Sequence, residues 1–417
     1  MRERKDSGIQ TIGKVPAHWK QKRLKFLCTI QTGNEDTQNA NPDGEYPFYV
    51  RSPIIERCDR YTFDGEGILV AGDGAGAGRI FHHAFGKYAV HQRVYRLANW
   101  DFNSKFIHYY LSSLFPYEMD KGSAQSTVPS MRLPMLQNFP LFIPPEYEAK
   151  NITNFLDKKC TEVDSIIENI QHQIELLQEY KQSVITEAVT KGLDKNVAMQ
   201  DSGIEWIGEI PTTWEIKKTK YIACSLSKGN GITKEDIVLD GDIQCVRYGD
   251  IYTQYDNAFS QTVTRTNTER ISSPKYIKKS DILFAGTGEL IDEIGKNIVY
   301  IGDEPCLAGG DIVIMKHSQN PLFLNYALNS IYSQAQKSMG KAKLKVVHIS
   351  ASDIGNIRIA LPPLDEQLAI AEYLDKQCNN IDSTIADKQK QLELLSDYKK
   401  SLIYEYVTGK KEVPADA

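Results

Sequence analysis

The chain has 417 residues, of which 41% are apolar and 25% charged, and its formal net charge is −5. This composition fits a soluble globular protein of two or three domains of about 100 to 200 residues each, and no apolar run approaches the ~18 residues that a membrane span needs. The first residues, MRERKDSG, have no apolar segment behind their charges, so we expect a cytoplasmic protein without a secretory signal.

The chain begins with a motif that it later repeats. Residues 6–22 (DSGIQTIGKVPAHWKQK) return as residues 201–217 (DSGIEWIGEIPTTWEIK), and the two stretches agree at nine of seventeen positions without a gap. The shared positions include two glycines, a proline and a tryptophan: Gly8/Gly203, Gly13/Gly208, Pro16/Pro211 and Trp19/Trp214. Such self-similarity indicates a duplication, so we expect a pseudo-two-fold internal repeat.

An apolar strand that runs into a glycine turn follows in each half. Residues 67–78 (GILVAGDGAGAG) resemble residues 281–292 (DILFAGTGELID). The first turn satisfies the loose GxGxxA form of a dinucleotide site, but no acid stands at the distance expected for the ribose, and the second turn lacks the pattern. We therefore predict no nucleotide site.

Basic residues gather after the first turn and in the second half. The first group is Arg79, His82, His83, Lys87, His91, Arg93 and Arg96. In the second half Lys341, Lys343 and Lys345 alternate along an expected strand, which would point all three to one face. No carboxylate or cysteine cluster accompanies the histidines, so we predict no metal site.

A basic run on its own is typical of a solvated surface. In two pseudo-equivalent domains, however, such runs favour phosphate binding, with Arg, Gln or Asn brought to base edges. On charge and position we select as candidate DNA-binding residues Arg79, His82, His83, Lys87, Arg93, Gln125, Arg132, Arg247, Lys296, Lys341, Lys343 and Lys345.

Each half ends in a long helical segment. Residues 143–190 return as residues 361–408 with a constant offset of 218, and both copies open with a proline pair suited to a first helical turn. Apolar residues recur at spacings of 3 and 4, which is typical of helices that pair by knobs-into-holes packing. The expected seam is Val163, Ile167, Ile170, Ile174, Leu177, Lys181 and Val184 with Ile381, Ile385, Leu392, Leu395, Lys399 and Leu402.

Two interpretations of these helices are open. Each could lie on its own domain, or the two could pair with each other. We favour pairing because the apolar stripe is too narrow for burial on a globular core. Lys181 and Lys399 interrupt the seam at the same position, where a polar residue can fix the register. The acidic excess of the chain also lies in these helices, so the net charge of −5 does not argue against DNA.

The segments between the repeated motifs mix short β-rich patterns with helical ones, which predicts an α+β fold. We expect a first globular domain at 1–143, a long helical segment at 144–195, a second globular domain at 196–361 and a second helical segment at 362–417. The spacing of the seven cysteines excludes a zinc knuckle and a dense disulfide framework, so we expect buried thiols.

No residues support catalysis. The double prolines read IPPE and LPPL rather than the [N/D]PP[Y/F] loop of a base-amino methyltransferase, and no GxxxxGK[ST] phosphate loop is present. No nucleophile stands at a recognisable spacing from a base. We therefore predict no catalytic residue, no metal and no cofactor.

The arrangement resembles the specificity (S) subunit of type I restriction-modification systems. The resemblance covers essentially the whole chain, through two DSGI..IG..P..W motifs and two long helices with PP...E and LD in their first turns. It implies two recognition domains for the halves of a bipartite DNA site, separated by an antiparallel coiled coil.

The same resemblance implies a complex with two methylation subunits and with restriction subunits. S-adenosylmethionine, ATP and Mg would then be held by these partners, while this chain supplies double-stranded DNA recognition and assembly only. Two other classes are open: a self-contained DNA methylase or nuclease, and an interaction scaffold with two ligand-binding β domains and no nucleic acid.

Overall fold

The computed structural model describes residues 2–122, 129–288, 293–339 and 347–414. The chain divides into two compact units: unit 1 comprises residues 1–171 and 389–417, and unit 2 comprises residues 172–388. Both units contain helices and strands, as the α+β prediction required. Within the described residues, no helix combines the length and the apolar character needed to cross a bilayer.

Unit 1 is built on two four-stranded sheets. The first has the order β4-β11-β8-β9 and is antiparallel throughout, whereas the second, β6-β5-β10-β7, contains one parallel pair between β5 and β10. Two further antiparallel pairs, β1-β2 and β3-β12, come from the ends of the domain. The strands are β1 Arg4–Asp6, β2 Lys14–Pro16, β3 Lys20–Arg23, β4 Thr29–Thr32, β5 Tyr46–Tyr49, β6 Glu56–Cys58, β7 Phe63–Asp64, β8 Gly67–Ala71, β9 Phe81–Ala84, β10 Lys87–Val90, β11 Val94–Ala98 and β12 Pro140–Ile143.

Unit 2 repeats this topology with additions. Its sheets have the orders β16-β26-β22-β24-β19 and β17-β20-β18-β25-β21, again with a parallel pair, β18 and β25, in the second. The strands are β13 Met199–Asp201, β14 Glu209–Pro211, β15 Glu215–Lys218, β16 Ala223–Lys228, β17 Ile237–Val238, β18 Ile243–Val246, β19 Ala258–Phe259, β20 Thr264–Thr266, β21 Tyr276–Ile277, β22 Ile282–Ala285, β23 Thr287–Gly288, β24 Asn297–Tyr300, β25 Cys306–Ala308, β26 Ile312–His317, β27 Val347–His348 and β28 Arg358–Leu361.

The helices of the two units also correspond. In unit 1, α1 is one helix with a proline inside it, whereas unit 2 divides the equivalent segment into α6 and α7 at Ser330. The helices are α1 Ser104–Gly122, α2 Leu133–Gln137, α3 Glu146–Lys191, α4 Thr219–Ile222, α5 Tyr248–Thr253, α6 Pro321–Asn329, α7 Ile331–Ser338, α8 Ala351–Asn356 and α9 Leu364–Val407.

The two long helices are shared between the units. The first part of α3 and the last part of α9 belong to unit 1, and the remaining parts belong to unit 2. Val184 and Ile185 of α3 join the core of unit 2, and Leu402 and Tyr406 of α9 join the core of unit 1. The core of unit 1 is therefore completed by a helix end that lies far from it in the sequence, whereas the end of α3 that joins the core of unit 2 directly precedes the strands of that unit.

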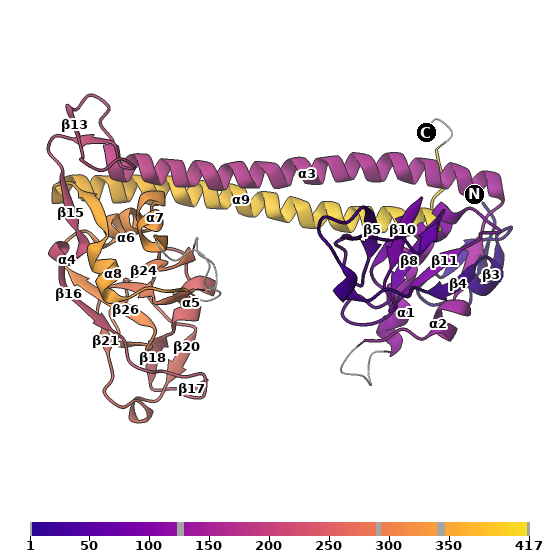
Figure 1. Cartoon of the computed structure of the whole chain (residues 1–417), viewed down its shortest axis with the longest axis horizontal. Coiled ribbons are helices and arrows are strands. Elements are labelled where there is room, and N and C mark those ends of the chain that lie inside the picture. The colour runs from indigo at the N-terminus through magenta and orange to yellow at the C-terminus, as the bar shows by residue number, and fades with distance from the viewer. Residues whose placement is uncertain (1, 123–128, 289–292, 340–346, 415–417) are drawn as a thin grey trace. The chain divides into compact units, whose positions relative to one another are not determined.

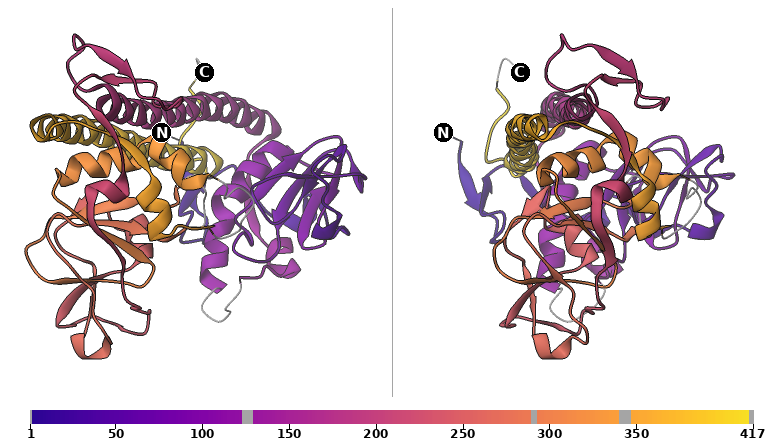
Figure 2. Two further views of the ribbon diagram at one scale, coloured as in Figure 1. Left: turned by 60° about the vertical axis from the view of Figure 1, so that its left-hand side comes forward. Right: turned by 90° about the vertical axis from the view of Figure 1, so that its left-hand side faces the viewer.

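Within each unit the segments of α3 and α9 run side by side (Figures 1 and 2). In unit 2, Lys181 Nζ lies 2.6 Å from Asp382, and Lys388 Nζ lies 2.5 Å from the side-chain oxygen of Gln173. As the residue number increases along α3, the residue number of its contact on α9 decreases, so the two segments are antiparallel.

Unit 1 repeats this contact with the roles of the two helices exchanged. Lys399 Nζ of α9 lies 2.5 Å from Asp164 of α3, and the rings of Phe155 and Tyr406 pack at 4.6 Å. Both lysine–aspartate pairs follow from one repeated pattern, because Lys399 and Asp382 stand 218 positions after Lys181 and Asp164.

The seam residues are the less exposed positions of these helices. On both helices every one of them is buried or half-buried, while the intervening residues are mostly exposed. The set comprises Val163, Ile167, Ile170, Ile174, Leu177, Lys181 and Val184 on α3 and Ile381, Ile385, Leu392, Leu395, Lys399 and Leu402 on α9.

The repeated motifs attach each unit to its helices. The buried Trp19 donates a hydrogen bond to Glu148 in the first turn of α3, and the buried Trp214 donates to Glu366 in the first turn of α9. Further along each of the two helices, the aspartate of the LD motif accepts a hydrogen bond from a tyrosine: Tyr109 donates to Asp157 at 2.9 Å, and Tyr326 donates to Asp375 at 2.7 Å. The sequence repeat is therefore a framework of buried contacts.

The cysteines are mostly internal, and all seven are free thiols. Cys160 and Cys378 are buried at equivalent helix positions. Cys224 is exposed and Cys28 is half-buried, so the expectation of buried thiols was wrong for these two. Cys224 lies on an edge strand, β16, at the irregularity between Ala223 and Ser225 where the register with β26 shifts, and its neighbour Ser225 is exposed as well.

Candidate nucleic-acid interface

The two sheets of each unit meet at a glycine. Gly33 follows β4 and Gly229 follows β16, and each lies so close to the facing chain that a Cβ would overlap a backbone carbonyl, that of Val90 or that of Gly309. The next amide donates to the same facing segment, from Asn34 to Val90 in unit 1. A glycine is needed here because no side chain fits between the two backbones.

Loops from five parts of the chain surround this glycine in each unit, and we call them the loop edge. In unit 1 the loop edge comprises residues 33–38, 50–55, 72–80, 91–93 and 129–132. In unit 2 it comprises residues 229–236, 247–253, 286–288, 309–311 and 347–350. Cross-contacts hold each set together, such as Gln92 to Asp36 at 2.8 Å and Thr287 to His348 at 3.0 Å.

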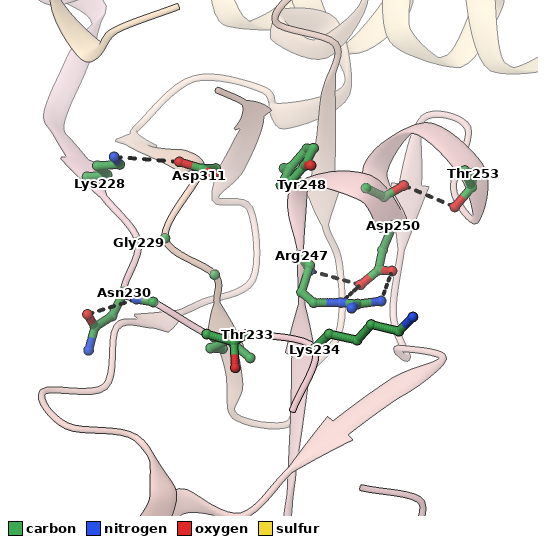
Figure 3. A pocket seen from close by; sticks show the side chains of 15 residues that line it. Lys228, Gly229, Asn230, Thr233, Lys234, Arg247, Tyr248, Asp250, Thr253 and Asp311 are labelled. Atoms are coloured by element: carbon green, nitrogen blue, oxygen red, sulfur yellow. Dashed lines mark hydrogen bonds and ion pairs between the residues drawn. The ribbon is translucent and has the colours of Figure 1, made fainter. Parts of the chain in front are cut away.

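The loop edge of unit 2 contains a groove of about 880 Å³ (Figure 3). Glycines 229, 231, 249, 309 and 310 form much of its wall, and side chains of both charges project around it. Lys228 lies 3.7 Å from Asp311, and Lys234 extends from the exposed rim without an ion pair among the residues described. A groove walled by backbone, with lysine side chains at its rim, suits an anionic ligand such as a nucleic acid.

Arg247 projects from the end of β18 into this groove. Its Nη2 donates to Asp250 at 3.1 Å, and Asp250 is itself 5% exposed. The backbone amide of Arg247 and the hydroxyl of Thr264 also donate to Asp250. The buried carboxylate therefore fixes the direction of the guanidinium.

The corresponding part of unit 1 holds two arginines on one carboxylate. Asp73 accepts from Arg51 at 3.0 Å and lies 3.4 Å from Arg93. Arg93 is one of the DNA-binding residues predicted from the sequence. Arg51 is not among them, because it follows the short strand β5 and has no basic neighbour in the sequence. Only the topology points to Arg51, because β5, like β18 of unit 2, belongs to the parallel pair of the second sheet of its unit.

Three other selected residues of unit 1 are on the surface. Arg79 belongs to the loop edge and forms an ion pair with Asp120 of α1. Arg132 is exposed at the start of α2. Lys87 begins β10 and lies over the ring of Tyr61 at 4.7 Å, away from the loop edge.

The selected histidines lie on opposite faces of β9. His82 contacts the carbonyl of Ser52 at 3.1 Å, whereas His83 contacts Glu66 at 2.7 Å and stacks on His108. Burial lowers the pKa of both His82 and His83, so they are mainly neutral near pH 7. His82 alone lies beside the loop edge.

Other members of the basic group are internal. His91 is 3% exposed and Arg96 is 8% exposed, with the Arg96 side chain donating to the hydroxyl of Tyr88. Lys296 of unit 2 is half-buried and donates to the carbonyl of Tyr255 at 3.0 Å, and burial lowers its pKa. A charge pattern in the sequence does not distinguish such internal cations from surface ones.

Four selected residues lie outside the described residues: Gln125, Lys341, Lys343 and Lys345. The strand that follows the three lysines, β27, pairs with β23 at the loop edge of unit 2. Their contribution to this surface stays a prediction.

The glycine turn of unit 1 has a structural explanation. A Cβ at Gly72 would lie 2.8 Å from the carbonyl of Arg93, and Gly74 and Gly78 adopt positive φ angles. The turn leads into β9 rather than into a helix whose N-terminus could hold a pyrophosphate. Among the described parts of the chain, no three His, Cys, Asp or Glu side chains are grouped as metal ligands.

Comparison with known proteins identifies the family. The model of the type I restriction modification DNA specificity domain matches twice, over residues 16–176 and 211–394. The chain is 26% identical to the type I restriction enzyme MjaVIII specificity subunit of Methanocaldococcus jannaschii, over 96% of this chain and 94% of that protein. It is 29% identical to the putative MjaX specificity subunit of the same organism, over 96% of each chain.

Similarity extends to other organisms and to a solved structure. The EcoDI specificity subunit of Escherichia coli is 26% identical, over 89% of this chain and 86% of that protein. A chain solved in work on complex assembly and conformational transition of the type I R-M system superimposes with a TM-score of 0.63 at 16% identity, over 95% of this chain and 99% of that chain, which shows a shared fold. Since the two family matches cover most of the sequence, this chain belongs to the family of type I restriction-modification DNA specificity subunits.

Proposed function

We propose that this chain reads a bipartite DNA site, with one unit for each half-site, and serves as the scaffold for the catalytic subunits of a type I complex. As a member of the specificity family it is not the catalytic component. The observation that carries the proposal is the loop edge, which occurs once in each unit at the same place in the topology but with different side chains. Two different half-sequences require two such surfaces.

The partners follow from the same proposal. Double-stranded DNA would meet the loop edges, two methylation subunits would bind the shared helices and the framework, and restriction subunits would join them. S-adenosylmethionine, ATP and Mg would then be bound by those partners. The repeated buried contacts of Trp19 and Trp214 with the helices support a pair of equivalent attachment sites, because they hold each unit on its helix in the same way.

The test is an exchange of one recognition domain. Residues 1–142 are replaced by the matching segment of a related specificity subunit, and the complex with its methylation subunits is expressed in a host whose genomic DNA is then mapped for methylated adenine. We expect one half-site to change completely and the other to stay. A change in both half-sites would contradict independent units.

A control separates this proposal from a self-contained methylase. The purified chain, incubated alone with S-adenosylmethionine and DNA, should transfer no methyl group, and its DNA binding should weaken steeply as salt is raised. Methyl transfer by the chain alone would refute the scaffold role, and an absence of DNA binding by the assembled complex would refute DNA recognition altogether.

A further inference from the structure

The guanidinium of Arg247 is held on one side only. Its Nε and Nη2 both face Asp250, at 3.5 Å and 3.1 Å. Nη1 has no partner within the described residues, so the far end of the guanidinium, formed by Nη1 and the second hydrogen of Nη2, keeps two parallel donors. The side chain is 30% exposed and lines the groove (Figure 3).

Two parallel donors match a particular base edge. The guanine edge in the major groove presents two adjacent acceptors, N7 and O6, and a bidentate arginine is its commonest protein partner. A planar guanidinium supplies this geometry, whereas a lysine ammonium does not. Since Asp250 already fixes the plane, little side-chain freedom remains to be lost on binding.

The same features make phosphate a poorer ligand for Arg247. A phosphate is bound mainly by net positive charge, and the carboxylate of Asp250 offsets the charge of Arg247. Lys234 is better suited to phosphate, because it is exposed on the rim of the same groove and has no ion pair within the described residues. The groove of unit 2 therefore combines the oriented donor pair of Arg247 with the exposed ammonium of Lys234.

Unit 1 carries an arginine near the same strand end, one position further along. Arg51 stands two residues after β5, whereas Arg247 directly follows β18, and each of these strands belongs to the parallel pair of its sheet. Arg51 uses Nη1 to contact Asp73, so its Nε and Nη2 edge is the one left as a donor pair. Its side chain is 43% exposed at the loop edge.

We propose that Arg247 reads a guanine in the half-site of unit 2 and that Arg51 reads a guanine in the half-site of unit 1. Asp250 and Asp73 act as positioning residues that fix the two guanidinium planes. This assignment rests on the proposed function, in which each unit reads one half-site.

The experiment compares variants of the complete complex with its methylation subunits. Methylated adenines are mapped in the genomic DNA of the expression host for the parent protein, Arg247→Ala, Arg247→Lys and Arg51→Ala. We expect Arg247→Ala to lose about 5- to 150-fold of discrimination at one G·C pair of one half-site, as for a lost bidentate contact. Arg51→Ala should relax one G·C pair of the other half-site.

Further variants separate base reading from other roles. Asp250→Asn should weaken discrimination at the same base pair as Arg247→Ala, which a merely structural role would not do. Lys234→Ala should reduce methylation evenly at all sites and lower the salt slope of binding by roughly 1. Arg358→Ala, on an exposed position of β28 outside the loop edge, should leave the motif unchanged.

Several results would overturn the assignment. These are an unchanged motif in Arg247→Ala, an even loss at all sites, relaxation in both half-sites, or a parent half-site of unit 2 that has no G·C pair. If Arg247→Ala fails to assemble, Arg247→Lys decides, because it keeps the charge and should still lose discrimination at that pair. Failure of the proposed function would show separately, as a change of both half-sites in the domain exchange.

Discussion

Units 1 and 2 have the same framework but different interiors. Near α1, the core of unit 1 is aromatic, with the rings of Phe81 and Phe115 at 6.4 Å. Near α6 and α7, the core of unit 2 contains a buried polar cluster: Asn297 donates to Asn325 at 2.8 Å, and the buried Lys337 donates to Asn297 at 2.9 Å. The same strand order therefore accommodates two kinds of packing.

The difference shows which residues the duplication has kept. The residues alike in both units join each unit to the helices, such as the glutamate partners of the two tryptophans. The residues that differ fill the cores and form the loop edges. A framework with fixed helix contacts and variable loops can change its ligand without changing its assembly, because loops on a rigid scaffold tolerate substitution.

The largest effect on stability is expected at Gly33 and Gly229, the glycines at which the two sheets of each unit meet. Gly229→Ala and Gly33→Ala place a Cβ against a backbone carbonyl, which cannot move without separating the sheets. Each substitution should cost more than about 3 kcal/mol in its own unit and greatly reduce the yield of folded protein. Thermal unfolding followed by circular dichroism measures this.

Gly231→Ala is the matched control, since its Cβ would meet nothing within 4 Å and Gly231 is not among the glycines with positive φ. It should behave like the parent protein. If Gly229→Ala were as stable as Gly231→Ala, the close approach of the two backbones would not constrain unit 2 as we infer.

Much of this framework could be predicted from the sequence. The constant offset of 218 located both long helices, and the 3-and-4 spacing selected the positions that prove to be buried or half-buried, including Lys181 and Lys399. The pairing of these lysines with Asp164 and Asp382 could not be predicted, because it depends on which turns of two distant segments lie opposite each other.

The candidate site was predicted less well for a physical reason. Burial decides which cations can reach a ligand, and charge in the sequence does not reveal it: Arg96 is internal, while Arg51 stands alone in the sequence and lies at the loop edge. One signal in the sequence could have located the glycine at which the two sheets meet. The pair Gly-Asn occurs at residues 33–34 and again at 229–230, at nearly the offset of the opening motif.

A smaller effect concerns the pH dependence of stability, which should differ between the two cores. Gly78 and Gly295 both have positive φ, and the side chain nearest to each is Met119 of α1 in unit 1 and Lys337 of α7 in unit 2. Burial lowers the pKa of Lys337 to about 7. Lys337→Met therefore gives unit 2 the residue that unit 1 has.

The sign of the pH effect follows from the lowered pKa. Below pH 7 the amine is protonated in both the folded and the unfolded state, so the cost of the buried charge is complete. Between pH 7 and the unfolded pKa near 10.5, folding releases the proton, and the stability of unit 2 rises by up to about 1.4 kcal/mol per pH unit.

The measurement compares the unfolding midpoint of the parent protein with that of Lys337→Met at pH 6, 7.5 and 9. From pH 7 to 9 the parent should gain roughly 2 kcal/mol, or about 4–8 °C, over the variant, because a unit of this size shifts ~2–4 °C per kcal/mol. Below pH 7 the difference should be constant. If the unfolding midpoints of the parent protein and of Lys337→Met differed by the same amount at all three pH values, Lys337 would stay charged in the folded protein.

The smallest effect concerns the two lysine–aspartate pairs, and it tests the symmetry of the units most closely. The Lys181–Asp382 pair has side chains 21% and 44% exposed, and the Lys399–Asp164 pair has side chains 29% and 49% exposed. Because both pairs are partly solvated, each should contribute only about 0.5–1 kcal/mol. Double-mutant cycles with Lys→Met and Asp→Asn in each pair measure the two coupling energies.

We expect these coupling energies to agree within about 0.3 kcal/mol, since the two pairs have nearly the same geometry and exposure. A slip of either helix by one turn would separate the lysine from its aspartate, so a measurable coupling in a unit shows that the register there is the one described. Coupling in one unit and none in the other would mean that the repeat is kept in sequence but not in helix register. The two cores, already unlike in polarity, would then be held by unlike helix pairs as well.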